Sequence, residues 1–184
     1  EGNAVEQADA EQAYIQTPMV GTETWIELPQ EAWPNSWFHG NRDTTRPKYH
    51  RPVVKMMRAL YGHPDAGTMW EEHCHKHLTN IGFRLVDNWP SCYWHEELSL
   101  FLTVYVDDFL MAGKPDALRK GWKRIKAAVQ MEEPHPIDVY LGCKIRITET
   151  VIDKHKYRVV EWDEEAYLKA IVDDYRALAK DLLS

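Results

Sequence analysis

The sequence has few cysteines and no long apolar run. Its three cysteines, Cys74, Cys92 and Cys143, are odd in number and form no Cys-x-x-Cys pair. We therefore expect reduced thiols in an intracellular protein rather than a disulfide scaffold. No apolar stretch approaches the length that crosses a bilayer, and no signal peptide opens the chain. The sequence predicts a soluble protein with no membrane partner.

Positive charge is also scarce. The formal net charge is −7, which is unfavourable for binding nucleic acid, because affinity for phosphates comes largely from Lys and Arg. Two basic stretches stand out, namely Arg42, Arg46, Lys48, Arg51, Lys55 and Arg58, and Arg119, Lys120, Lys123, Arg124 and Lys126. The first could contact a nucleic-acid strand. A solvated surface is the simpler interpretation of either stretch, and the second has the spacing of an outer helix face.

The apolar pattern predicts one α+β domain. With 184 residues, 44% of them hydrophobic, the chain can bury one substantial core. We expect strands around Ala8–Asp9 and at 24–28, 92–95, 98–112, 139–147 and 157–162. A proline-bearing loop is expected at 29–52, and a short regular element at 53–60.

Three helices are expected. The first runs from Pro64 and Asp65 to about residue 80 and is stopped by Gly82. The second covers 115–130, with four apolar residues facing inward, namely Leu118, Trp122, Ile125 and Val129. The third is capped by Asp163. Its apolar residues recur at helical spacing, and they are Tyr167, Ile171, Val172, Tyr175, Leu178 and Leu182.

Two adjacent carboxylates, Asp107 and Asp108, lie between the apolar runs 100–106 and 109–112. Neighbouring like charges at the tip of an apolar hairpin repel each other and lower the stability of the fold. Such a pair is better explained as a site that binds divalent cations. Asp9 lies 98 residues before Asp107, and a folded sheet could bring it to the same place. Three carboxylates suffice for two-metal nucleotidyl transfer. An ordinary turn for Asp107-Asp108 and a capping role for Asp9 are the alternatives.

Four blocks of the sequence carry a family resemblance. They are Gln7–Tyr14, Ala59–Gly62, Tyr105–Asp108 and Tyr140–Ile145, in that order. The chain resembles the reverse transcriptases of copia-type LTR retrotransposons, and weaker likenesses between the blocks extend the resemblance over nearly its whole length. A lone Tyr-x-Asp-Asp is a weak signal, whereas ordered blocks at family-like separations are specific.

The resemblance implies the fold of a right-hand polymerase. We expect an antiparallel palm sheet with packed helices, forming a single reverse transcriptase domain fragment over residues 1–184. Residues 1–113 would hold the palm with partial fingers elements, and 114–184 the palm end and a thumb-like region. Only eight residues precede Asp9, so we expect the fingers to be largely missing and the chain to be a fragment of a Pol polyprotein.

The resemblance also implies an RNA-directed DNA polymerase. Asp9, Asp107 and Asp108 would hold two Mg²⁺ or Mn²⁺ ions for transfer of a nucleotide to a primer 3′-hydroxyl, with Asp108 supporting the site more than ligating it. The implied partners are an RNA or DNA template with primer, deoxynucleoside triphosphates, and the integrase and RNase H of the polyprotein. The implied location is a cytoplasmic virus-like particle or the nucleus.

Four further residues match the family's nucleotide pocket. Tyr14 matches an aromatic residue that packs under the deoxyribose and excludes a 2′-hydroxyl, although a core tyrosine is the alternative. Tyr61 and Gly62 match a side chain and a close-approaching backbone that line the pocket, with a plain helix-entry turn as the alternative. Tyr105 opens the carboxylate block and would contact the nucleotide.

The chain departs from the family pattern after Gly62. Copia-type enzymes usually read Leu-Lys-Gln-Ala-Pro-Arg-Ala-Trp there, whereas residues 63–70 read His-Pro-Asp-Ala-Gly-Thr-Met-Trp, without either cation. Fewer cations weaken phosphate binding, and Asp65 could repel a phosphate. The departure and the missing fingers support an alternative function, a catalytically silent retroelement remnant that acts at most as a nucleic-acid or protein interaction module.

A second candidate site lies in His73-Cys74-His75-Lys76-His77. His73 and His77 are four residues apart, so on a helix they share a face and could bind Zn²⁺. Glu72 and Cys74 would lie on other faces, and no clear third ligand has the expected spacing. A partly buried amphipathic helix is therefore the preferred interpretation.

Overall fold

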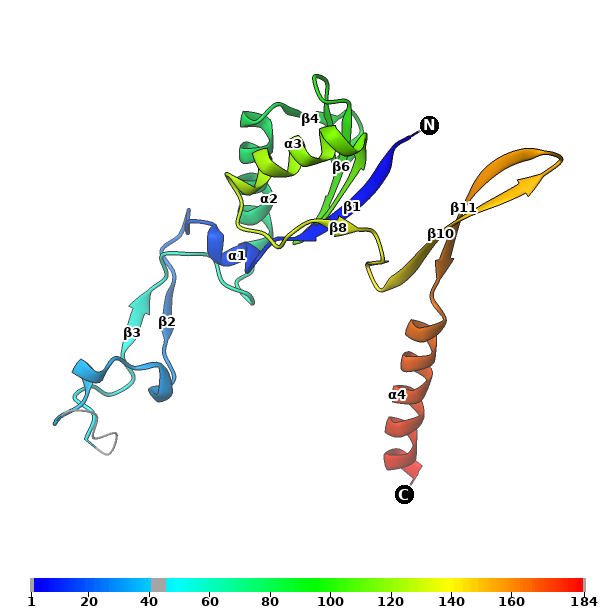
Figure 1. The fold of residues 1–184 in the computed structure, drawn as a ribbon. Coiled ribbons are helices and arrows are strands. Elements are labelled where there is room, and N and C mark those ends of the chain that lie inside the picture. The colour runs from blue at the N-terminus through cyan, green and yellow to red at the C-terminus, as the bar shows by residue number, and fades with distance from the viewer. Residues whose placement is uncertain (1, 41–45, 184) are drawn as a thin grey trace. The chain divides into compact units, whose positions relative to one another are not determined.

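A computed structural model describes residues 2–40 and 46–183, with the side chains of 181–183 left out. The chain forms two compact units, one of Glu1–Glu11 with Leu78–Ser184 and the other of Gln12–His77. Figure 1 follows the chain through both. Arg42 of the first basic stretch and the Leu182 side chain lie outside the described residues. A single domain over residues 1–184 stays a prediction.

The first unit is built on a six-stranded antiparallel sheet with the strand order β4-β5-β6-β7-β1-β8. Its strands are β1 (Ala4–Asp9), β4 (Phe83–Val86), β5 (Trp89–His95), β6 (Leu100–Tyr105), β7 (Asp108–Gly113) and β8 (His135–Pro136). Side chains alternate between the two faces, so every second residue of β6 and β7 enters the core. Leu100, Leu102, Phe109 and Met111 are fully buried. The predicted antiparallel α+β architecture and the hairpin at 98–112 are confirmed.

Helix α3 (Pro115–Lys126) packs on β6 and β7. Proline fits the first helical turn, where its missing N–H is not needed. Leu118, Trp122 and Ile125 are buried as expected. The expected end near residue 130 is wrong. The backbone leaves the helix after Lys126 because the Gln130 carbonyl accepts the Glu11 N–H at 3.0 Å and Met131 bridges to Ala10.

Two glycines allow α3 to approach the sheet closely. A Cβ on Gly121 would lie 2.5 Å from Leu100 Cδ1 and 3.0 Å from Met111 Sδ. A Cβ on Gly113, at the end of β7, would also collide with the Leu100 side chain. These distances are shorter than van der Waals contacts. The side chains of Leu100 and Met111 therefore fill the space that a side chain at position 113 or 121 would need.

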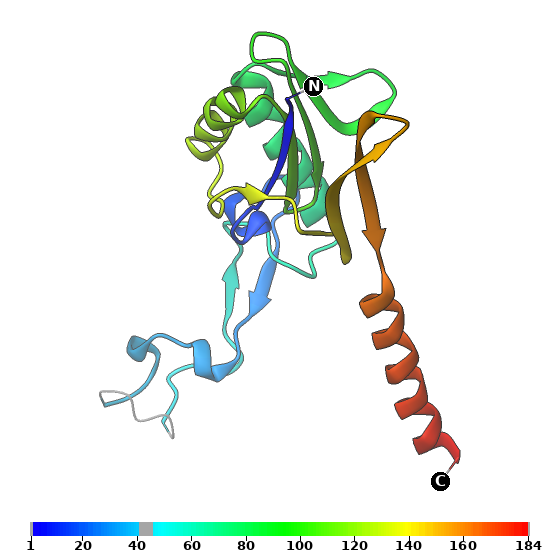
Figure 2. The ribbon, with the colours of Figure 1, turned by 45° about the vertical axis from the view of Figure 1, so that its right-hand side comes forward.

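The C-terminal part of the first unit holds a three-stranded sheet with the order β11-β10-β9 and a final helix (Figure 2). These elements are β9 (Val139–Tyr140), β10 (Cys143–Ile152), β11 (His155–Asp163) and α4 (Glu165–Leu183). The expected single strand at 139–147 is wrong. Leu141 and Gly142 have φ of 50° and 78°, so the chain turns there and Tyr140 pairs back onto Cys143.

Helix α4 begins as the sequence predicts. The Asp163 Oδ1 atom accepts the Glu165 backbone N–H at 3.0 Å, which confirms the cap. The expected apolar residues are 45–71% exposed in this structure, and they are Tyr167, Ile171, Val172, Tyr175 and Leu178. None of the helices in the described part of the chain is long and apolar enough to cross a membrane.

The second unit begins with α1 (Ala13–Gln16) and ends within α2 (Ala66–Asn80). Between them β2 (Trp25–Glu27) pairs antiparallel with β3 (Val53–Lys55), and the connecting loop holds two short 3-10 helices, η1 (Gln30–Ala32) and η2 (Asn35–Trp37). The expected helix near 65–80 is confirmed, and so is the loop predicted at 29–52 over its described residues, 29–40 and 46–52, while 41–45 lie outside the described residues. A small core forms from Ala59, Ala66 and Met69, with Tyr14 and Met19 packed against it.

Two strands of the large sheet are missing from the sequence-based prediction. The strand β8 contains Pro136 and follows Pro134, which are signals of a loop, yet it pairs with Glu6 and Gln7 at the sheet edge. The other strand, β4, is four residues long and contains the fully buried Phe83. Both edge strands are held by long-range pairing, which periodicity in a short window does not report.

Candidate active site

The adjacent carboxylates lie at a tight hairpin. Tyr105 pairs with Asp108 across β6 and β7, which leaves only Val106 and Asp107 in the turn. Val106 has a φ of 55°, a left-handed conformation that β-branched residues rarely adopt. A positive φ at the first turn residue matches the twist of two-residue hairpins, so the register forces this conformation on Val106.

Asp9 reaches the same place through β1. This strand pairs antiparallel with β7, in a register that sets Asp9 opposite Asp108. The next residue, Ala10, donates its N–H to the Asp107 carbonyl at 2.8 Å. The Asp9 carbonyl accepts the Glu132 N–H at 2.9 Å on the other side. Backbone hydrogen bonds therefore fix the end of β1 against the carboxylate hairpin.

The electrostatics of Asp108 reflect this crowding. Burial, the negative charges of Asp9 and Asp107, and a hydrogen bond with Asp9 raise the pKa of Asp108 to about 6. Burial disfavours the ionised form by removing water from it, and the negative charges of Asp9 and Asp107 disfavour it by repulsion. The side chains of Asp9 and Asp108 are thus in contact.

The carboxylates fit a hard divalent cation in their chemistry, since Mg²⁺ and Mn²⁺ prefer oxygen ligands. Asp9 and Asp108 are in mutual contact, and the Asp107 backbone is bonded to the residue after Asp9. Within residues 2–40 and 46–180, however, no three Asp, Glu, His or Cys side chains are grouped closely enough to hold an ion together. The structure therefore brings two of the three carboxylates together, and a metal role for all three stays a prediction.

Two tyrosines flank this hairpin in different ways. Tyr105, which the sequence predicts to contact nucleotide, is 59% exposed and pairs with Asp108 through the backbone. Tyr140 was given no role by sequence reasoning. Burial raises its pKa, a hydrogen bond with Thr103 opposes this, and Asp108 and Cys92 add further increases. These influences show that Tyr140 lies near the hairpin. It belongs to the block at 140–145, which was the only sequence signal.

The other predicted nucleotide-pocket residues lie together in the second unit. The ring centroids of Tyr14 and Tyr61 are 4.4 Å apart, with a tilt of 36° between the planes. Tyr14 also packs on the small core around Ala66 and Met69. Gly62 has a φ of 93°, a conformation that favours glycine. The structure thus brings Tyr14, Tyr61 and Gly62 together, and their contact with nucleotide stays a prediction.

The histidine pair on α2 forms a ring contact. His73 and His77 stack edge to face with centroids 4.4 Å apart, and burial, followed by the charge of His77, lowers the pKa of His73. No third ligand joins them within the part of the chain that the structure describes. Trp70 and Cys74 are buried on the same helix, in keeping with the amphipathic helix that the sequence favoured.

Comparison with known families identifies the class of protein. A family model described as "Reverse transcriptase (RNA-dependent DNA polymerase)" matches residues 3–177, so the chain belongs to this family. The predicted reverse transcriptase class is confirmed at that level. The family generally uses divalent metals, and it implies a nucleic-acid template and nucleotide substrates. No solved structure matches the chain.

Proposed function

We propose that this chain is the palm-centred part of an RNA-directed DNA polymerase from a copia-type element. The observation that carries the proposal is the β1–β7 register, which sets Asp9 opposite Asp108 at the end of the carboxylate hairpin. Opposed carboxylates cost stability in an unliganded sheet. The arrangement is therefore better explained by a cationic ligand than by the fold.

Asp9, Asp107 and Asp108 are the residues that would hold two Mg²⁺ or Mn²⁺ ions. When bound, such ions acidify a primer 3′-hydroxyl and neutralise charge on the departing pyrophosphate. The contribution of this chain is positioning, because the Ala10 N–H and the Glu132 N–H fix the backbone on both sides of the carboxylates.

The six-stranded sheet is proposed as the palm. Its β6–β7 hairpin and β1 supply all three carboxylates, as a palm requires. Residues 1–113 would include the palm with partial fingers elements, and 114–184 the palm end and a thumb-like region. The copia-type assignment rests on the four sequence blocks, including Tyr140–Ile145, where Tyr140 lies near Asp108.

Tyr14 is proposed to exclude ribonucleotides. Its ring is held between Tyr61 and the small core, so it cannot move aside at low cost to admit a 2′-hydroxyl. Tyr61, Gly62 and Tyr105 are proposed to complete the contacts to the nucleotide.

Primer extension on poly(rA)/oligo(dT) with Mg²⁺ or Mn²⁺ tests the proposal. The chain should extend the primer, and the isosteric Asp107→Asn variant should lose extension. A matched control replaces one of two adjacent carboxylates elsewhere, Asp173 and Asp174 on α4, and Asp173→Asn should extend as the parent does. No extension by the parent would overturn the polymerase proposal and favour the catalytically silent interaction module.

A further inference from the structure

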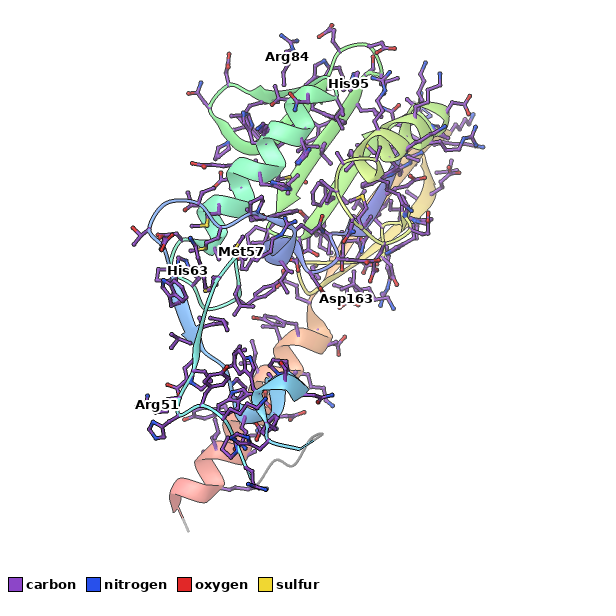
Figure 3. The ribbon with its side chains drawn as sticks, turned by 90° about the vertical axis from the view of Figure 1, so that its left-hand side faces the viewer. Arg51, Met57, His63, Arg84, His95 and Asp163 are labelled. Atoms are coloured by element: carbon purple, nitrogen blue, oxygen red, sulfur yellow. The ribbon has the colours of Figure 1, made fainter. Side chains whose placement is uncertain are left out.

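The strand β11 forms one edge of the three-stranded sheet. Among the described residues it pairs with β10 on one side and with no strand on the other. Its nine residues pair with β10 in one unbroken register, from Asp163 opposite Lys144 to His155 opposite Ile152. Figure 2 shows this long hairpin, and Figure 3 labels Asp163 at the end of β11. The outer edge of β11 therefore offers backbone N–H and C=O groups to a further strand.

The other sheet edges of this unit are protected against such pairing. The strand β8 has two residues and contains Pro136, which has no N–H to donate. The strand β4 has four residues, and its register with β5 shifts between Leu85 and Val86. Short strands, prolines and bulges are the usual means of blunting an exposed edge. The strand β11 is more than twice as long as β4 and contains neither proline nor glycine. Its edge is therefore suited to pairing.

The side chains of β11 also favour a neighbour. Its large apolar residues are 41–59% exposed, and they are Tyr157, Val159, Val160 and Trp162. A two-stranded ribbon is marginally stable in water, and β9 adds only two residues to the β10–β11 pair. A further strand beside β11 would cover part of this apolar surface and satisfy the open backbone edge at the same time.

The charges along β11 identify the neighbour. The first half of the strand is basic, and the second half, with the residue that follows it, is acidic. In chain order these residues are Lys156, Arg158, Glu161, Asp163 and Glu164. A second β11 that runs antiparallel sets the basic half of each strand against the acidic half of the other, with Val159 near the two-fold axis. A parallel copy would set like charges together, which destabilises a strand pair.

We propose that the outer edge of β11 pairs antiparallel with β11 of a second copy of this chain. The two three-stranded sheets then form one sheet with the order β9-β10-β11-β11-β10-β9. The same surface is used on both copies, so the contact closes at two chains, and only the two-residue strand β9 remains at each outer edge. The interaction goes beyond the proposed polymerase function, because it uses no residue of the carboxylate hairpin.

Sedimentation equilibrium of the full chain over a series of concentrations tests this proposal. The molar mass should rise from the 21.6 kDa of one chain toward twice that value. Lys156→Glu with Arg158→Glu makes both halves of β11 acidic, and Glu161→Lys with Glu164→Lys makes both halves basic. Each double variant alone should dimerise at least about tenfold more weakly than the parent, because like charges then face each other across the dimer.

An equimolar mixture of the two double variants should dimerise again, since an acidic β11 then lies against a basic one. Their formal net charges are −11 and −3, because each pair of substitutions changes the parent's −7 by four. Both proteins are thus negative, and general attraction does not explain the recovery. Arg158 Nη1 also donates to the Asn3 carbonyl at 3.0 Å, a contact that its replacement removes. Recovery in the mixture separates the loss of this contact from the effect of charge.

The matched control is Lys120→Glu with Lys123→Glu, which makes the same change of charge at exposed positions of α3. This variant should dimerise like the parent, and so should Asp107→Asn, which separates the dimer proposal from the polymerase proposal. A parent that stays monomeric at every concentration would overturn the inference. An undiminished dimer in both β11 variants would also overturn it by placing the contact on another surface, as would loss of the dimer in both without recovery on mixing.

Discussion

Asp9 and Asp108 face each other across the β1–β7 strand pair although 99 residues separate them in the sequence. Their side chains are hydrogen-bonded, and the pKa of Asp108 is raised to about 6. Directly opposed like charges destabilise a strand pair, so the fold tolerates a local cost at the place where we propose the metal chemistry. The contact between Asp9 and Asp108 can therefore be tested through the stability of the protein, without primer or template.

The first prediction concerns pH. Burial, Asp9 and Asp107 raise the pKa of Asp108 from 3.8 to about 6, so the folded protein holds this proton more tightly than the unfolded chain does. The contribution of Asp108 to the free energy of unfolding must then fall as the pH rises from about 4 to about 6, and the loss is complete above that range. Asp108→Asn should escape this loss, which solvent at the half-buried site limits to about 1 kcal/mol.

Urea unfolding in EDTA, from about pH 4 to about pH 8, checks this sign. The stability of Asp108→Asn relative to the parent should rise with pH across the interval and then level off. A difference between the two proteins that is the same at both ends of the range would show that Asp108 titrates alike in the folded and unfolded states.

A second prediction concerns the divalent ion. A ligand at ten times its dissociation constant stabilises the folded state by about 1.4 kcal/mol. We expect Mn²⁺ to raise the Tm of the parent by about 3 °C, and excess EDTA to reverse the increase. The increase in Tm should be lost in Asp107→Asn and kept in Asp173→Asn. Asp173 is the matched control because it also has an adjacent carboxylate, Asp174. An equal shift in all three proteins would place the ion elsewhere.

A third prediction concerns the turn between the carboxylate strands. Val106 has a φ of 55° and is 37% exposed, so it combines an unfavourable conformation with little burial. Val106→Gly should raise the free energy of unfolding by about 1 kcal/mol, since glycine adopts positive φ without strain but costs more entropy on folding. Val104→Gly, within β6, is the control and should destabilise the protein. Loss of stability in Val106→Gly would show that the turn carries no strain.

The hairpin and the helices could be predicted from the sequence because their signals are local. The apolar runs around Asp107 and Asp108, the spacing of Leu118, Trp122 and Ile125, and the capping position of Asp163 all act within a few residues. Asp9 was proposed as the third carboxylate, but no local pattern connects it to the hairpin, and the resemblance only supported the choice. Its place opposite Asp108 depends on strand register.

The missed features depend on contacts that are distant in the sequence or on backbone conformation. The strand β8 looks like a loop because of its proline, and only pairing with Glu6 and Gln7 makes it a strand. The turn at Leu141 breaks an otherwise apolar run, since a leucine gives no sign of a φ of 50°. The proximity of Tyr140 to Asp108 was missed because it is a contact between residues that are distant in the sequence.

A fourth prediction concerns the three thiols. Cys74 is 3% exposed, and burial followed by the charge of Glu71 raises its pKa to about 12. Cys143 is 7% exposed, and burial raises its pKa as well, whereas Cys92 is only half-buried. A thiol reagent at about pH 8 should therefore modify Cys92 at least about tenfold faster than the other two, because the thiolate is the reactive form. Cys92→Ser should remove the fast phase; removal of that phase by Cys74→Ser would contradict the burial of α2.

The fifth prediction compares two helical glycines. Gly121→Ala should destabilise the protein by about 1 kcal/mol, because the collision of the new methyl group with Leu100 Cδ1 and Met111 Sδ outweighs the gain in helix propensity. The matched control is Gly67→Ala in α2, where the nearest atom to the new Cβ would be the Tyr14 hydroxyl oxygen at 3.9 Å. That substitution should stabilise the protein by about 0.5 kcal/mol through helix propensity alone. Urea unfolding of both variants should give changes of opposite sign, and stabilisation by Gly121→Ala would mean that α3 does not pack on β6 and β7 as closely as described.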